Sequence, residues 1–134
     1  MPPMPKKRIL AVDDDASMRE FYETTLEMLG YTAQIASGAG AAKESISLLR
    51  PDLILMDIMM PEQDGISLTR ELRNNIKTSD IPIIMVSGLA DAGTLQDALL
   101  FGAVGYIVKP VDADALKAKI EQTLSALEHR KKRP

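Results

Sequence analysis

Three acidic residues follow a short apolar run near the start of the chain. The stretch ILAVDDDAS, residues 9–17, places Asp13, Asp14 and Asp15 directly behind four aliphatic residues. One acidic cap is enough to start a helix and contributes about 1 kcal/mol. Two unit charges held about 4 Å apart, at an effective dielectric constant of roughly 20, repel each other by roughly 4 kcal/mol. Exposed side chains can move apart and avoid this repulsion. Whether the three acids form a functional site therefore depends on which other groups the fold brings close to them.

Three further polar residues each follow another apolar run. Asp57 comes after LILM, Ser87 after IIMV and Lys109 after YIV. Together with Asp13 and Asp14 they make three carboxylates, one hydroxyl and one ammonium. A divalent cation and Lys109 would balance the three carboxylates, and hard oxygen ligands suit Mg²⁺. Such a site can transfer a phosphoryl group to a carboxylate, because aspartate can act as the nucleophile and the reaction depends mainly on positioning and electrostatics.

The apolar runs predict the strands that position these residues. Most runs are continuous rather than alternating with polar residues, which is typical of strands buried on both faces of a parallel sheet. One further segment is more mixed and predicts an edge strand. The predicted strands are Ile9–Val12, the edge strand Tyr31–Ala36, Leu53–Met56, Ile83–Val86 and Tyr106–Val108.

The segments between the strands have the apolar spacing of helices. Either Ser17, in a capping box with Glu20, or Asp15 can start the first of them. Five strands alternating with five helices predict an α/β fold, a doubly wound (βα)5 parallel sheet with helices on both faces. Because parallel strands end at one edge, the polar residues that follow them can meet there, where α/β proteins bind ligands. The predicted helices cover residues 16–29, 39–49, 65–76, 91–101 and 112–128.

The composition limits the class of protein and the kinds of partner. The chain has 134 residues, 46% of them apolar and 26% charged, and fits one globular domain. Its net charge of -3 gives no reason to expect nucleic-acid binding, and the absence of Cys excludes disulfides and thiolate metal ligands. No apolar stretch approaches the length of a membrane span, so we expect a cytoplasmic protein. Within the single domain, residues 1–134, we expect 1–7 and 130–134 to be flexible ends.

Four segments, in their order and spacing, resemble the receiver domain of two-component response regulators: ILAVDDD, LILMDIMMPEQDG, MVSG and GYIVKP. The resemblance extends from Arg8 to about Leu127. It implies a flavodoxin-like sheet with strand order 2-1-3-4-5, which the alternation of strands and helices does not determine. It also implies a signalling switch rather than a turnover enzyme.

The resemblance assigns a role to each acidic residue of the predicted site. Asp57 corresponds to the phosphoacceptor, which takes a phosphoryl group from a sensor histidine kinase or a histidine phosphotransfer protein. Asp13, Asp14 and the backbone carbonyl of Met59 correspond, with Asp57, to the Mg²⁺ ligands. Lys109 corresponds to the cation that contacts the phosphoryl group.

The resemblance also implies how such a switch works. Ser87 would draw toward the aspartyl phosphate, and Tyr106 would turn inward into the space that the following loop vacates. The surface that changes is formed by the fourth helix, the fifth strand and the fifth helix, near residues 89–120, and it would bind a downstream protein. The Lys109–Pro110 peptide is cis in the family, whereas sequence alone gives a cis bond before proline a frequency of only about 5–6%.

Two alternatives remain open at this stage. A phosphatase of the haloacid-dehalogenase type also uses an Asp nucleophile, Mg²⁺, a hydroxyl and a Lys on a parallel sheet, and Asp13 and Asp15 resemble its paired acids. That family needs another acidic pair at a strand end, whereas Asp112 and Asp114 are expected at a helix start, and Asp57 would have no role. The second alternative is a receiver that works unphosphorylated as a scaffold, although no residue needed for the chemistry is missing.

Overall fold

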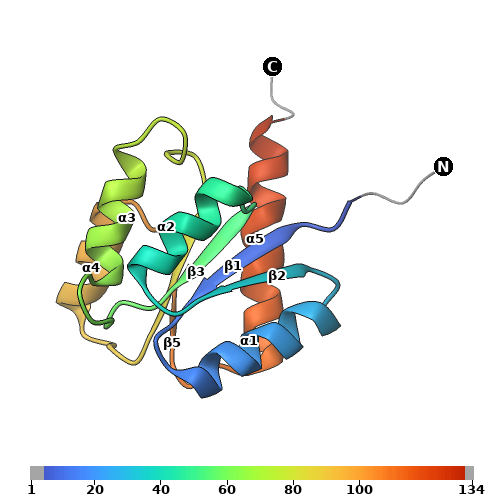
Figure 1. Cartoon of the computed structure of the whole chain (residues 1–134), viewed down its shortest axis with the longest axis horizontal. Helices are drawn as coiled ribbons and strands as arrows, with labels where there is room; N and C mark the ends of the chain where they lie inside the picture. Colours follow the sequence, from blue (N-terminus) through green and yellow to red (C-terminus); the bar gives the residue numbers. More distant parts are fainter. Residues whose placement is uncertain (1–4, 132–134) are drawn as a thin grey trace.

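The computed structural model describes residues 5–131, which form a single parallel sheet with helices on both sides (Figure 1). The strand order is β2-β1-β3-β4-β5, and every neighbouring pair of strands is parallel. This is the class and the order that we expected, and β2 lies at an edge as predicted. The strands are β1 (Arg8–Val12), β2 (Thr32–Ala36), β3 (Leu53–Met56), β4 (Ile83–Ser87) and β5 (Gly105–Val108).

Two apolar clusters show which helices cover which face of the sheet. Successive residues of a strand point to opposite faces. In β1, Ile9 and Ala11 pack with residues of the first and fifth helices, whereas Leu10 and Val12 pack with residues of the second, third and fourth. All residues of β3 are fully buried, as expected for a strand covered on both faces. The helices are α1 (Ala16–Met28), α2 (Ala39–Leu48), α3 (Gly65–Arg73), α4 (Ala92–Leu100) and α5 (Ala113–Lys131).

Of the two possible caps for the first helix, the structure uses Asp15. The Asp15 carboxylate accepts a hydrogen bond from the N–H of Met18 at 3.3 Å. Ser17 lies inside the first turn of α1 and is exposed. Because the helix begins at Ala16, only residues 13–15 separate β1 from α1. We call residues 13–15 the acidic turn.

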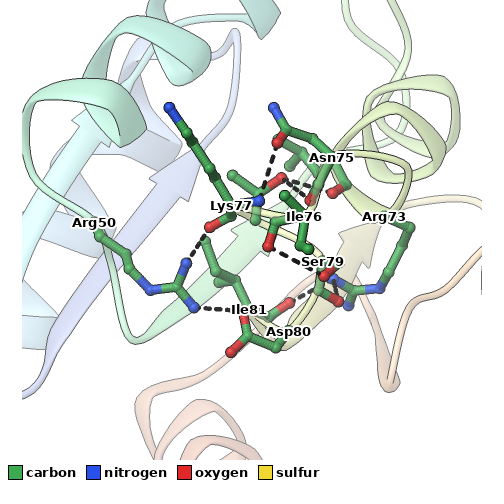
Figure 2. A network of polar contacts seen from close by, with 10 residues as sticks. Arg50, Arg73, Asn75, Ile76, Lys77, Ser79, Asp80 and Ile81 are labelled. Atoms are coloured by element: carbon green, nitrogen blue, oxygen red, sulfur yellow. Dashed lines mark hydrogen bonds and ion pairs between the residues drawn. The ribbon is translucent and has the colours of Figure 1, made fainter.

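The end of α3 differs from the prediction. The helix ends at Arg73, and Ile76, the last residue of the helix predicted over 65–76, is 90% exposed. Thr78 takes the buried position instead, and its hydroxyl donates to the carbonyl of Leu72 at 2.6 Å. Figure 2 shows how the loop that follows is held: the guanidinium of Arg73 donates to the carbonyl of Ile81 at 2.7 Å. Ile76 has the spacing of a buried helical residue, but it lies after the end of the helix. The hydrogen bond from Thr78 to the carbonyl of Leu72 holds the loop in a different direction.

The last helix is longer than predicted. Helix α5 continues to Lys131, so residues 130 and 131, which were expected in a flexible end, are helical. Asp112 starts this helix, as its carboxylate accepts the N–H of Ala115 at 2.7 Å. Residues 5–7 of the other expected end have no helix or strand, and residues 1–4 and 132–134 lie outside the described residues. None of the helices that the structure describes has both the length and the apolar character needed to cross a membrane.

Candidate functional site

The carboxyl ends of the strands bring the acidic residues together. Asp13 follows β1 and Asp57 follows β3. The N–H of Asp57 donates to the carbonyl of Val12 at 3.0 Å, which holds the two strand ends side by side. One carboxylate oxygen from each of Asp13, Asp14 and Asp57 lies within 4.8 Å of the other two. The three acids therefore meet at one edge of the sheet, as the strand order requires.

Lys109 reaches the same place from the end of β5. Its ammonium lies 2.8 Å from Oδ2 of Asp13 and 3.6 Å from Oδ1 of Asp57. Its backbone N–H donates to the carbonyl of Ser87 at 2.8 Å, which aligns the ends of β4 and β5. Charged groups of the site thus follow β1, β3 and β5, and β4 lies between β3 and β5 in the sheet.

Burial changes the acid–base properties of this cluster. Asp13 is fully buried and Asp57 is 6% exposed. Burial, followed by the charge of Asp13, raises the pKa of Asp57 from 3.8 to about 6, although Lys109 acts in the opposite direction. Burial by itself would lower the pKa of Lys109, but its hydrogen bond to Asp13 and the nearby carboxylates raise that pKa above its usual value. At neutral pH the site therefore contains a charged Lys109 and a largely ionised Asp57.

The charges of the cluster fit a divalent cation. Three carboxylates face one ammonium, which leaves about two negative charges that are not balanced. Asp14 is exposed and, within the part of the chain that the structure describes, forms no hydrogen bond or ion pair. Carboxylate oxygens with room for water are the ligands that Mg²⁺ prefers. These residues could hold such an ion.

The two predicted switch residues contact the backbone of the same neighbour, Leu89. Ser87 is buried, and its Oγ accepts the N–H of Leu89 at 3.2 Å. Tyr106 is half-buried, and its hydroxyl donates to the carbonyl of Leu89 at 2.6 Å. The loop between β4 and α4 is therefore held from both sides at one residue.

Two further predictions concern residues beside the strand ends. The Lys109–Pro110 peptide is cis, as the family resemblance implied. Met59 lies two residues after Asp57 with its side chain 65% exposed. Its backbone carbonyl stays a predicted metal ligand.

Gly65 is a residue of the site that the sequence analysis did not identify. It begins α3, and a Cβ at this position would lie 2.0 Å from the backbone oxygen of Asp57. Its N–H donates to the carbonyl of Ile58 at 2.8 Å. Only glycine allows α3 to approach the backbone of the candidate phosphoacceptor this closely. The signal in the sequence was a glycine directly after the N-cap residue Asp64, where other residues are better helix formers.

Arg19 is the second residue that was missed. Its guanidinium Nη1 donates to the backbone carbonyl of Asp13 at 2.9 Å. No spacing in the sequence distinguishes this arginine from an exposed one on a helix surface.

The structure does not support the phosphatase alternative. Asp15 caps α1 and therefore does not pair with Asp13 as a second acid of the site. Asp112 caps α5, and Asp114 is exposed in the first turn of that helix. No second acidic pair at a strand end lies among the residues described, whereas Asp57 is in the site.

Comparison with known proteins agrees with this geometry. The sequence model of the response regulator receiver domain matches residues 9–121. The "Probable transcriptional regulator ycf27" of Cyanophora paradoxa is 41% identical over 124 residues, which are 92% of this chain and 51% of that protein. The chain spans about half the length of the curated relatives of this type that it matches.

Solved structures show the same fold. A CheY-like receiver domain protein from Methanospirillum hungatei is 33% identical, with a TM-score of 0.87, and the match covers 94% of this chain and 99% of that one. The chemotaxis protein CheY4 of Vibrio cholerae is 27% identical, with a TM-score of 0.84, and the match covers 88% of this chain and 98% of that one. A receiver is a signalling domain rather than a classical enzyme. With its family sequence match, its strand order and its cluster of acids beside a lysine, the chain belongs to the receiver domain family of two-component response regulators.

Proposed function

We propose that Asp57 accepts a phosphoryl group in the presence of Mg²⁺ and that this modification switches the surface formed by α4, β5 and α5. The observation that carries the proposal is the meeting of Asp57 with Asp13, Asp14 and Lys109 at one edge of the sheet. A nearly buried carboxylate next to a fixed ammonium is a suitable acceptor, because phosphoryl transfer depends on placement and charge.

In this transfer the protein contributes the nucleophile and one positive charge, and the donor contributes the phosphoryl group. A carboxylate oxygen of Asp57 forms a bond to phosphorus as the bond from phosphorus to the donor's imidazole nitrogen breaks. The electron pair of that bond stays with the nitrogen, which takes a proton from solvent. Lys109, 3.6 Å from Asp57, places a positive charge beside the phosphoryl oxygens. Mg²⁺, held by Asp13, Asp14, Asp57 and the carbonyl of Met59, would supply further positive charge.

The donor in this proposal is a sensor histidine kinase or a histidine phosphotransfer protein. Each chain accepts one phosphoryl group and later loses it by hydrolysis, so the protein is a switch and not a turnover enzyme. The contrasting possibility is a receiver that acts unphosphorylated as a scaffold, and the experiment below separates the two.

The output follows from the contacts of Leu89. A phosphoryl oxygen that bonds the hydroxyl of Ser87 competes with the bond between Ser87 and Leu89, which is 3.2 Å long. Release of Leu89 also removes the acceptor of the Tyr106 hydroxyl, so that Tyr106 can turn inward. We name residues 89–120 the output face. Four exposed apolar side chains lie in it: Leu99, Leu100, Val104 and Val108. A downstream protein is the proposed partner of this face.

Incubation with a small phosphodonor such as acetyl phosphate and Mg²⁺ tests the proposal. Intact-protein mass spectrometry should show one labile phosphoryl group on the wild type and none on Asp57→Asn. Asp52→Asn is the matched control, because Asp52 is an exposed acid that contacts the start of β1 through the N–H of Arg8 at 2.7 Å. Asp14→Asn should require more Mg²⁺ for the same rate.

Three results would contradict this function. Equally labile labelling of Asp57→Asn would show that another residue accepts the group. A wild-type protein that stays unlabelled at saturating Mg²⁺, yet still binds its partner, would favour the scaffold. Sustained hydrolysis of phosphate esters would show that the protein is a phosphatase and not a switch.

A further inference from the structure

Each backbone and side-chain polar group of Asp13 has its own partner. Its N–H donates to the carbonyl of Ala36 in β2 at 3.1 Å, and its carbonyl accepts from Nη1 of Arg19 at 2.9 Å. Its Oδ1 accepts the N–H of Asp15 at 2.9 Å and its Oδ2 accepts from Lys109 at 2.8 Å. Three of these partners have been described above: Ala36 belongs to β2, Asp15 to the acidic turn, and Lys109 to the site. Arg19 is the additional one.

Arg19 connects the first turn of α1 to the end of β1. Its backbone N–H donates to the carbonyl of Asp15 at 3.0 Å, as the first turn of the helix requires. Its side chain returns along the helix to the carbonyl of Asp13. The backbone bond and the side-chain bond together close a ring around residues 13–15, the acidic turn. Two of the four candidate metal ligands, Asp13 and Asp14, lie in this turn.

The contact of Arg19 is with a backbone carbonyl and not with an acid. Within the described residues, Arg19 forms no ion pair with a carboxylate. Its charge therefore leaves the oxygens of Asp13 and Asp14 available to a cation. An arginine suits this task, because its guanidinium stays charged and its planar shape fixes the direction of the hydrogen bond.

We propose that Arg19 is a positioning residue for the metal site: it holds the acidic turn so that Asp13 and Asp14 face the same point as Asp57. This inference rests on the proposed function, because it concerns the affinity of the same site for Mg²⁺. Partners that orient ligands from outside the coordination shell commonly contribute 10-fold or more to metal affinity.

Calorimetric titration of the metal-free protein with Mg²⁺ tests the proposal. Arg19→Ala should bind Mg²⁺ about 10-fold more weakly than the wild type, and the affinity of Arg19→Lys should lie between the two. Arg70→Ala is the matched control, because it removes the same group from α3, where it stacks over the ring of Phe101 at 5.2 Å. That control should bind Mg²⁺ like the wild type.

A second measurement needs no metal. In the metal-free protein the N–H of Asp15 is bonded to Oδ1 of Asp13, so its hydrogen exchange reports the order of the acidic turn. Exchange at Asp15 should become faster in Arg19→Ala and stay unchanged in Arg70→Ala, while circular dichroism at the assay temperature shows both variants folded.

The outcomes separate this inference from the proposed function. If the wild type binds Mg²⁺ and Arg19→Ala binds it equally well, the positioning role is wrong while the proposed function stands. If Arg19→Ala does not fold, Arg19→Lys decides: weaker Mg²⁺ binding supports the role, and unchanged binding contradicts it. If the wild type itself binds no Mg²⁺, the proposed function is wrong, and the role of Arg19 is wrong with it.

Discussion

Lys109 is hydrogen bonded to Asp13 at 2.8 Å, through the second of the two carboxylate oxygens of that buried acid. The first oxygen accepts the N–H of Asp15. Both oxygens of Asp13 thus have a partner before any cation binds. A divalent cation at Asp13 must therefore use a further lone pair of one of these oxygens, and there it competes with the positive charge of Lys109.

This competition makes a prediction for Lys109→Met. The substitution removes a unit positive charge from a site that would hold two more, so it should strengthen Mg²⁺ binding by about 10-fold or more. It should also slow phosphorylation, since no ammonium remains beside Asp57. Calorimetry on the metal-free protein checks the affinity, and Lys117→Met, which removes an exposed lysine paired with Glu121, is the control. Weaker Mg²⁺ binding in Lys109→Met would mean that the lysine organises the acids instead of competing with the cation.

The raised pKa of Asp57 predicts how stability depends on pH in the metal-free protein. The folded state holds the proton of Asp57 up to about pH 6, whereas the unfolded chain releases it near 3.8. Between these values the folded state binds more protons, so the free energy of unfolding falls as the pH rises. The shift corresponds to about 3 kcal/mol. The free energies of unfolding of the wild type and of Asp57→Asn should be measured at pH 4 and pH 7. The difference between the two proteins should change in favour of the variant by about this amount over that range.

Mg²⁺ provides the internal control for this pH dependence. A bound cation favours ionised Asp57, so saturating Mg²⁺ should reduce the stability that the wild type loses as the pH rises from 4 to 7. It should have little effect on Asp57→Asn. Parallel stability curves for the two proteins without Mg²⁺ would contradict the raised pKa.

Gly65→Ala should damage both the fold and the site. The new Cβ would lie 2.0 Å from the backbone oxygen of Asp57, so α3 or the strand end must move. We expect a loss of about 3 kcal/mol or more in the free energy of unfolding, together with slower labelling by a phosphodonor. Gly40→Ala in α2 is the matched control, because nothing lies within 4 Å of its Cβ position. That variant should be slightly more stable than the wild type, by up to about 1 kcal/mol. Equal free energies of unfolding for Gly65→Ala and Gly40→Ala would show that α3 can adjust to the added Cβ without loss of stability.

The sequence predicted those parts of the site that follow from the sheet. Asp57 and Lys109 come directly after apolar runs, and in a parallel sheet the ends of such runs meet at one edge. The alternation of apolar runs and helices therefore located these side chains without any knowledge of their contacts. The order of the strands came from the family resemblance, since the alternation alone permits other orders.

The sequence did not predict contacts that involve backbone atoms. Arg19 and Gly65 act on the carbonyls of Asp13 and Asp57, and no residue type marks which carbonyl a distant group will meet. Ile76 was placed in a helix by its spacing, but the hydrogen bond of Thr78 to the end of α3 leaves it outside. Tertiary contacts decided these positions, and the only local signal among them was the glycine that follows the N-cap residue Asp64.

Tyr106→Phe tests whether Leu89 is held from both sides. The Tyr106 hydroxyl donates to the carbonyl of Leu89 at 2.6 Å, while the N–H of Leu89 donates to Ser87 at 3.2 Å. Loss of one such hydrogen bond costs about 1 kcal/mol, so hydrogen exchange at the Leu89 amide should become about fivefold faster. Tyr31→Phe is the matched control, because the half-buried Tyr31 hydroxyl forms no hydrogen bond within the described part of the chain.

The same variant connects the loop to the output face. If the Tyr106 bond restrains the loop between β4 and α4, its loss should favour the arrangement that phosphorylation is proposed to produce, in which Leu89 is released. Amides at the start of α4 should then exchange faster in unphosphorylated Tyr106→Phe, whereas amides of α2, on the other side of β3 in the sheet order, should not change. Unchanged exchange at Leu89 would mean that Ser87 alone holds the loop, and Tyr106 would then follow the switch without restraining it.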